Sequence, residues 1–150
     1  PTMKILFINP PNSVPAKWNF PLNIFQPLGI SYIAAVLEKE GHNVKILDAL
    51  AEGWQNERII DGIKYSGLTQ EEIAEEIKGF NPDIVGIAFL FTFQAREGHN
   101  MAKTAKKVNP NIFVIAGGAH ATTLPQEVLN DPNIDCNVMG EGEYTVKELD

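Results

Sequence analysis

The sequence has a single cysteine, Cys136, among 150 residues, and this scarcity excludes two kinds of site. One cysteine cannot form an internal disulfide, and it cannot supply an all-cysteine metal cluster. Because Cys136 falls within an apolar stretch, we interpret it as a structural thiol. The lack of disulfide chemistry predicts a cytoplasmic location.

Long apolar runs and basic residues are also scarce. No run of eighteen apolar residues occurs, so no membrane span is predicted, and Pro1–Ile5 does not resemble a signal peptide. Twelve Lys and Arg against nineteen Asp and Glu give a net charge of −7. Since phosphate backbones and anionic lipid surfaces attract concentrated positive charge, we expect no nucleic acid and no membrane as partner.

Two common nucleotide-binding motifs are missing as well. Neither G-x-G-x-x-G nor G-x-x-x-x-G-K-[ST] occurs, which excludes ordinary dinucleotide and P-loop sites. Pro10 and Pro11 follow the first predicted strand, where a phosphate loop would need backbone N–H donors. These absences favour a large, mostly neutral ligand.

What the sequence does contain is an alternation of apolar runs and amphipathic stretches. Short apolar runs predict five strands, at residues 4–9, 43–48, 84–91, 112–116 and 134–139. Amphipathic stretches predict helices at residues 27–40, 69–80, 95–108 and 125–130, and a last helix from Glu143. Residues 13–26 are predicted to be irregular, and residues 49–67 have no assignment.

Strands separated by helix-length crossovers form a parallel sheet, and right-handed crossovers place helices on both faces. The predicted fold class is therefore α/β, a doubly wound, Rossmann-like domain with a five-stranded parallel sheet in the order 2-1-3-4-5. The uniformly apolar run 84–91 is predicted to be interior. A chain of 150 residues suffices for one such domain. Since it stops just after a helix begins, we expect a domain excised from a longer chain.

Such sheets bind ligands beyond the carboxyl ends of their strands, so the residues at those exits are the candidate site. Two exits are rich in glycine, which lets a bulky ligand approach the backbone but also serves to close a tight strand–helix turn. The candidate ligand-contacting residues at the exits are Pro10, Pro11, Asn12, Thr92, Phe93, Gln94, Gly117, Gly118, His120, Gly140, Glu141 and Gly142.

The titratable residues form no recognisable catalytic group, and no catalytic or metal-ligating residue is predicted. Of the three histidines, His42 is interpreted as structural and His99 as a solvent-facing or capping residue of a helix. His120 stands at a strand exit, where ligand contact and a purely local role are both open. Glu141 and Glu143 either bind ligand hydroxyls or favour the positive end of the last helix.

Six motifs follow one another along the chain: Pro10-Pro11-Asn12, Pro27-Leu28-Gly29-Ile30, Glu40-Gly41, Asn81-Pro82-Asp83-Ile84-Val85-Gly86, Gly117-Gly118-Ala119-His120-Ala121-Thr122 and Gly140-Glu141-Gly142-Glu143. In this order they resemble the N-terminal cobalamin-binding domain of cobalamin-dependent radical SAM proteins. The resemblance runs through essentially the whole chain.

The resemblance implies a Rossmann-like domain that holds cobalamin at the carboxyl edge of its sheet. It implies that residues 10–12 lie under the corrin, and that Thr92, Phe93, Gly117, Gly118 and residues 140–142 surround the nucleotide tail. It also implies a partner outside these residues, a radical SAM barrel of the same chain that carries a [4Fe–4S] cluster and binds S-adenosylmethionine. Many members of the family are methyltransferases.

Two family motifs are absent from these residues. The chain lacks the Cys-x-x-x-Cys-x-x-Cys motif of the cluster, so it is predicted to hold the cofactor without catalysing the reaction alone. It also lacks the Asp-x-His-x-x-Gly sequence of corrinoid-carrying methyltransferase domains; Asn9-Pro10-Pro11-Asn12 stands where that histidine is expected. We therefore predict that the cobalt has no histidine ligand.

Two other interpretations remain. The first is a domain of the same ancestry that binds no corrinoid and contacts only the substrate or the barrel. The second is a free-standing flavodoxin-like or receiver-type regulatory domain. A receiver domain needs acidic residues after the first strand and an aspartate after the third, where this chain has Asn9-Pro10-Pro11 and Phe91-Thr92-Phe93.

Overall fold

The structure is a computed structural model that describes residues 2–17, 28–89, 95–118 and 125–138. Its main sheet consists of five parallel strands, β1 (Lys4–Asn9), β3 (Asn43–Asp48), β6 (Ile84–Ala88), β7 (Phe113–Gly117) and β8 (Cys136–Val138). The strands lie in the order β3-β1-β6-β7-β8. The predicted order 2-1-3-4-5, with the third strand of the parallel sheet in the interior, is therefore confirmed.

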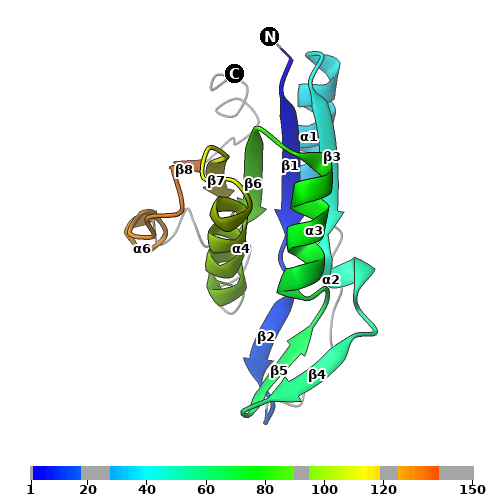
Figure 1. Cartoon of the computed structure of the whole chain (residues 1–150), viewed down its shortest axis with the longest axis vertical. Coiled ribbons are helices and arrows are strands. Elements are labelled where there is room, and N and C mark those ends of the chain that lie inside the picture. Colours follow the sequence, from blue (N-terminus) through cyan, green and yellow to red (C-terminus); the bar gives the residue numbers. More distant parts are fainter. Residues whose placement is uncertain (1, 18–27, 90–94, 119–124, 139–150) are drawn as a thin grey trace.

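Helices cover both faces of this sheet (Figure 1). Alternate residues of a strand point to opposite faces, so β1 contributes Ile5 and Phe7 to one face and Leu6 and Ile8 to the other. The helix α1 (Leu28–Lys39) packs on the first face. The second face carries the helices α3 (Gln70–Phe80), α4 (Ala95–Val108) and α6 (Pro125–Leu129).

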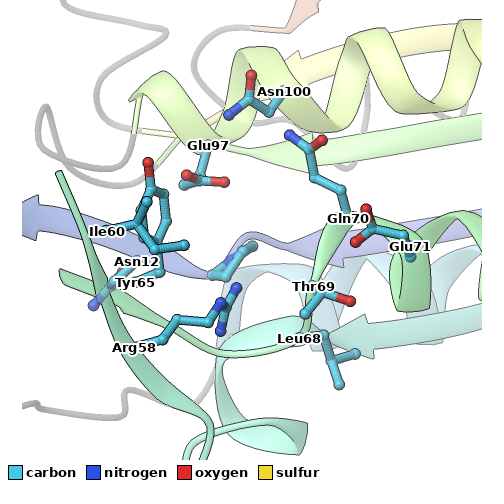
Figure 2. A pocket seen from close by; sticks show the side chains of 11 residues that line it. Asn12, Arg58, Ile60, Tyr65, Leu68, Thr69, Gln70, Glu71, Glu97 and Asn100 are labelled. Carbon is cyan, nitrogen blue, oxygen red and sulfur yellow. The ribbon is translucent and has the colours of Figure 1, made fainter. Parts of the chain in front are cut away.

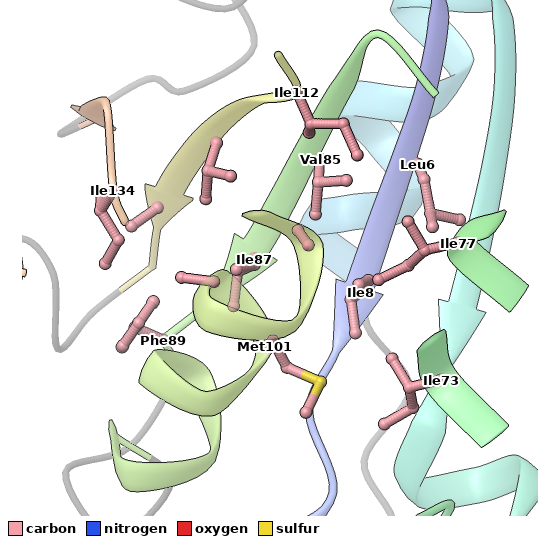
Figure 3. Close-up of a cluster of buried hydrophobic side chains, with 14 of the residues drawn as sticks. Leu6, Ile8, Ile73, Ile77, Val85, Ile87, Phe89, Met101, Ile112 and Ile134 are labelled. Atoms are coloured by element: carbon pink, nitrogen blue, oxygen red, sulfur yellow. The ribbon is translucent and has the colours of Figure 1, made fainter. Parts of the chain in front are cut away.

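The larger core lies between the sheet and the helices α3 and α4, as Figure 3 shows. Ile73 and Ile77 of α3 are fully buried, and so is Met101 of α4. The spacing of the two isoleucines places both on one side of α3. The helix begins with a capping box, in which the Thr69 hydroxyl accepts from the Glu72 N–H (3.1 Å) and the Glu72 carboxylate accepts from the Thr69 N–H (3.0 Å).

A second, antiparallel sheet lies beyond the carboxyl ends of β1, β3 and β6 (Figure 1). It consists of β2 (Asn12–Pro15), β5 (Ile63–Ser66) and β4 (Glu57–Ile60), in that order. The prediction that residues 13–26 are irregular is wrong for residues 13–15. The unassigned stretch 49–67 contains α2 (Ala49–Glu52), β4 and β5. This small sheet places additional side chains at the edge where the ligand is predicted.

The ends of several elements differ from the predicted ones. β6 ends at Ala88, three residues before the predicted end, and β7 is shifted by one residue to 113–117. The predicted last helix, which starts at Glu143, lies outside the described residues.

Replacing Gly98 of α4 with alanine should lower the free energy of unfolding by about 1–3 kcal/mol. A β-carbon there would lie 2.5 Å from the ring of Phe89, which is fully buried. The matched control is Gly79→Ala in α3, where nothing lies within 4 Å of the added atom. That change should stabilise the protein by up to about 1 kcal/mol, since alanine favours a helix over glycine. Urea denaturation of both variants measures the difference, and equal effects would contradict the packing argument.

Candidate functional site

The candidate site begins where β1 passes into β2. Pro10, Pro11 and Asn12 are buried between the two sheets, and Asn12 already pairs with Ser66 of β5. The first predicted exit is thus a short buried connection. It lies at the carboxyl edge of the main sheet, where the resemblance places the corrin.

The two glycines at the end of β7, Gly117 and Gly118, allow the strand ends to pack closely. Gly117 pairs with Ala88, and its carbonyl accepts from the Phe89 N–H at 2.7 Å. Gly118 has a φ of +116°, and a β-carbon on it would lie 2.8 Å from the Phe89 carbonyl oxygen. The local role that the sequence left open for this glycine pair is therefore present. Contact of the two glycines with a ligand stays a prediction.

The other candidate residues lie outside the described part of the chain. They are Thr92, Phe93, Gln94, His120, Gly140, Glu141 and Gly142.

Two of the three histidines, His42 and His99, lie within the described residues, and each has a hydrogen-bond partner. The Met3 N–H donates to His42 Nδ1 at 3.1 Å, next to the first residue of β3 and at the opposite end of the sheet from the candidate site. The structural role predicted for His42 is confirmed. His99 Nδ1 lies 2.6 Å from a carboxylate oxygen of Asp131, and its ring stands edge-on to Phe89 at 5.3 Å. His99 thus has a defined side-chain partner and is more than the capping residue that the sequence suggested.

Buried polar side chains gather at the carboxyl edge of the main sheet. The Asn9 amide donates to the Asp48 carboxylate at 3.0 Å, and the same carboxylate oxygen caps α2 through the Ala51 N–H. The Asn9 Oδ1 and the Ser13 hydroxyl are both buried, and neither has a hydrogen-bond partner among the described residues. Unsatisfied buried acceptors are costly and rare in folded proteins. This edge therefore fits a ligand that carries hydrogen-bond donors.

A pocket of about 300 Å³ opens between the amino ends of α3 and α4 and the small sheet (Figure 2). It is continuous with the predicted site, because two of the candidate residues line it. The residues that line the pocket are Pro11, Asn12, Arg58, Ile60, Tyr65, Leu68, Thr69, Gln70, Glu71, Glu97 and Asn100.

Three charged side chains of this pocket, Arg58, Glu71 and Glu97, were not predicted as site residues from the sequence. Glu97, in the first turn of α4, is only 4% exposed. It forms no hydrogen bond or ion pair with any residue in the described ranges. Arg58 is held in place by two hydrogen bonds from its Nη1, to the carbonyls of Asn56 (3.0 Å) and Gly67 (3.2 Å). Its guanidinium also lies 5.7 Å from the ring centre of Tyr65.

The single thiol is not an activated one. Burial, with a smaller contribution from the charge of Asp135, raises the pKa of Cys136 above its ordinary value, so the thiol stays protonated at neutral pH. Within the described ranges, no three His, Cys, Asp or Glu side chains are grouped to hold a metal ion. No helix in those ranges has the length and apolar character needed to cross a bilayer.

The chain was compared with known protein families, curated proteins and solved structures. A family model described as the B12 binding domain matches residues 21–150. The chain is 43% identical over 146 residues to the cytidylyl-2-hydroxyethylphosphonate methyltransferase of Streptomyces wedmorensis, covering 95% of this chain and 27% of that protein. It is 40% identical over 148 residues to an uncharacterized methyltransferase of Pyrococcus horikoshii, covering 98% of this chain and 28% of that protein.

The chain thus spans about a quarter of the length of these curated relatives. Among solved structures, the cobalamin-dependent S-adenosylmethionine radical enzyme OxsB, with aqua-cobalamin and S-adenosylmethionine bound, superposes with a TM-score of 0.68. The match covers 99% of this chain and 18% of OxsB, at 18% sequence identity. At that identity the likeness shows the fold.

Proposed function

Because this chain belongs to the B12 binding domain family, we propose that it holds cobalamin at the carboxyl edge of its five-stranded sheet. The resemblance to the cobalamin-binding domains of radical SAM proteins, which six sequence motifs predict, is confirmed by the family match and the relatives. The observation that carries the proposal is the group of buried polar side chains beside the β1 exit, with Asn9 Oδ1 and the Ser13 hydroxyl unpartnered.

The chemistry of these side chains fits the cofactor. Cobalamin is large and carries many amide groups, whose N–H donors match the free acceptors Asn9 Oδ1 and Ser13 Oγ. When bound, it supplies a cobalt centre that can carry a methyl group. On this proposal Pro10, Pro11 and Asn12 lie against the corrin. The remaining contacts come from the exits at Thr92, Phe93, Gln94, Gly117, Gly118, His120, Gly140, Glu141 and Gly142.

We expect this site to offer no histidine to the cobalt. The β1 exit consists of two prolines and an asparagine, and none of these side chains resembles an imidazole donor. His42 lies at the other end of the sheet, and His99 already contacts Asp131. His120 belongs to the exit after β7, which the resemblance places beside the nucleotide tail. A cobalt centre without a strong lower nitrogen ligand is easier to reduce than a histidine-ligated one.

The whole protein is then a radical SAM enzyme of the methyltransferase type, in which this chain holds the corrinoid. The two relatives above are methyltransferases, and the chain spans about a quarter of each. The remaining length of such a protein would supply the barrel, with a [4Fe–4S] cluster and S-adenosylmethionine. The residues of this chain position the cofactor and shield it from water.

The experiment is a titration of the chain with hydroxocobalamin, followed by electron paramagnetic resonance of the cobalt(II) form. The chain should retain the cofactor on gel filtration, and no histidine nitrogen should split the cobalt signal. Splitting that disappears in His42→Ala, His99→Ala or His120→Ala would refute the absence of a histidine ligand. Splitting that survives all three changes belongs to the cofactor's own base. A chain that does not retain cobalamin would instead be the corrinoid-free domain of the same ancestry.

A further inference from the structure

The pocket between α3, α4 and the small sheet is lined by a largely buried glutamate that has no polar partner within the described part of the chain. Glu97 is 4% exposed, lines the pocket, and has no hydrogen bond or ion pair within the described ranges. An acidic residue in the first turn of a helix is favoured by the helix dipole, which explains why a glutamate can stand there. The dipole does not explain why a glutamate that is only 4% exposed has no hydrogen-bond donor among the described residues.

The opposite side of the pocket offers a donor. Figure 2 shows Glu97 and Asn100 of α4 on one side and Arg58 of β4 on the other. The guanidinium has five N–H donors, and the two hydrogen bonds to Asn56 and Gly67 come from Nη1 alone. Among the described residues its remaining donors have no partner, so they can donate to an oxygen atom of a ligand.

The presence of Glu97 and Arg58 on opposite sides of the pocket restricts the chemistry of the occupant. A simple anion would be repelled by Glu97 and by Glu71, which also lines the pocket, and a simple cation would leave the Arg58 N–H donors without an acceptor. A group with a carbonyl oxygen and an N–H₂ side by side satisfies both partners, because the oxygen accepts from Arg58 and the nitrogen donates to Glu97. A primary carboxamide has this arrangement.

We propose that this pocket binds a primary amide arm from the periphery of the corrin. Pro11 and Asn12 line the pocket and are also candidate cofactor residues, so the pocket adjoins the edge where the corrin is placed. A pocket of about 300 Å³ has room for an amide arm but is too small for the ring itself. The inference rests on the proposed function, because it requires cobalamin at the neighbouring edge.

The test compares cobalamin binding by the chain and by Glu97→Gln in an absorbance titration. Loss of a charged hydrogen-bond acceptor should weaken binding about tenfold. The matched control is Glu75→Gln on the exposed side of α3, outside the pocket, which should stay within about twofold of the unchanged chain. Thermal melting shows whether each variant is folded.

The second probe is a set of cobalamin monocarboxylates, in each of which one primary amide is hydrolysed to a carboxylate. The unchanged chain should bind at least one isomer about tenfold more weakly than cobalamin, because two carboxylates would face each other. Glu97→Gln should remove most of this discrimination, a rescue that a merely structural glutamate would not give.

The outcomes separate the two proposals. Cobalamin binding by Glu97→Gln within about twofold of the unchanged chain, or equal affinity of the unchanged chain for cobalamin and every monocarboxylate, overturns the amide subsite and leaves the proposed function standing. If Glu97→Gln does not fold, the monocarboxylate series on the unchanged chain decides alone. Failure of the unchanged chain to bind cobalamin overturns both.

Discussion

Replacing Phe89 with alanine is expected to lower the free energy of unfolding by about 3–5 kcal/mol. Phe89 is fully buried, belongs to the core under α4, and contacts Gly98 and His99 through its ring. Truncation removes these contacts and leaves a cavity where the end of β6 meets α4. Since a domain is stable by only about 5–15 kcal/mol, a large part of that stability would be lost.

Phe113→Ala is the matched control, because it removes the same atoms from a partly exposed site. Phe113 is 38% exposed at the start of β7, so its truncation should cost about 1 kcal/mol. Urea denaturation monitored by circular dichroism measures both variants. Similar losses at the two positions would show that the Phe89 ring is not a central part of the core.

The main sheet could be predicted from the sequence because its central strands are buried on both faces. Such strands are continuous apolar runs: β6 is buried at all five positions, β1 at five of six, and β7 at its three central positions. Helix-length connections then leave few topologies, and right-handed crossovers select one of them. The predicted end of the third strand lies three residues too far along the chain, because the apolar sequence continues past Ala88, the last residue of β6 that pairs with β7.

The small sheet was missed because its strands are mixed in character. Ile59 and Ile60 of β4 are exposed, and β2 includes an asparagine, a serine and a proline. One signal was nevertheless present. Asp61-Gly62 stands between β4 and β5 with φ values of 51° and 78°, and Asp-Gly between two short strand-like runs is a strong hairpin signal. A hairpin with its turn at Asp61-Gly62 places Arg58 opposite Tyr65, as the structure has them.

Glu97 could not have been found in this way. A glutamate in the first turn of an amphipathic helix is ordinary, and its sequence neighbours give no sign that it is buried. Its burial depends on the small sheet, which approaches the amino end of α4 from a distant part of the chain. Long-range packing of this kind leaves no local pattern in a single sequence.

Replacing Gly118 with alanine should lower the free energy of unfolding by about 2–5 kcal/mol and should also weaken cobalamin binding. Two costs add here. The φ of +116° is unfavourable for alanine by about 1–2 kcal/mol. The new β-carbon would also lie 2.8 Å from the Phe89 carbonyl oxygen, and backbone cannot move aside as a flexible side chain can, which adds about 1–3 kcal/mol of overpacking.

Gly62→Ala separates these two costs, because Gly62 also has a positive φ but nothing within 4 Å of an added β-carbon. Its replacement should cost about 1–2 kcal/mol and leave cobalamin binding unchanged. At Gly118 the clash forces the carboxyl ends of β6 and β7 apart, and the proposed site is built on those ends. Denaturation and cobalamin titration on both variants test this. If Gly118→Ala costs no more stability than Gly62→Ala and binds cobalamin as the unchanged chain does, the close contact between Gly118 and Phe89 does not shape the site.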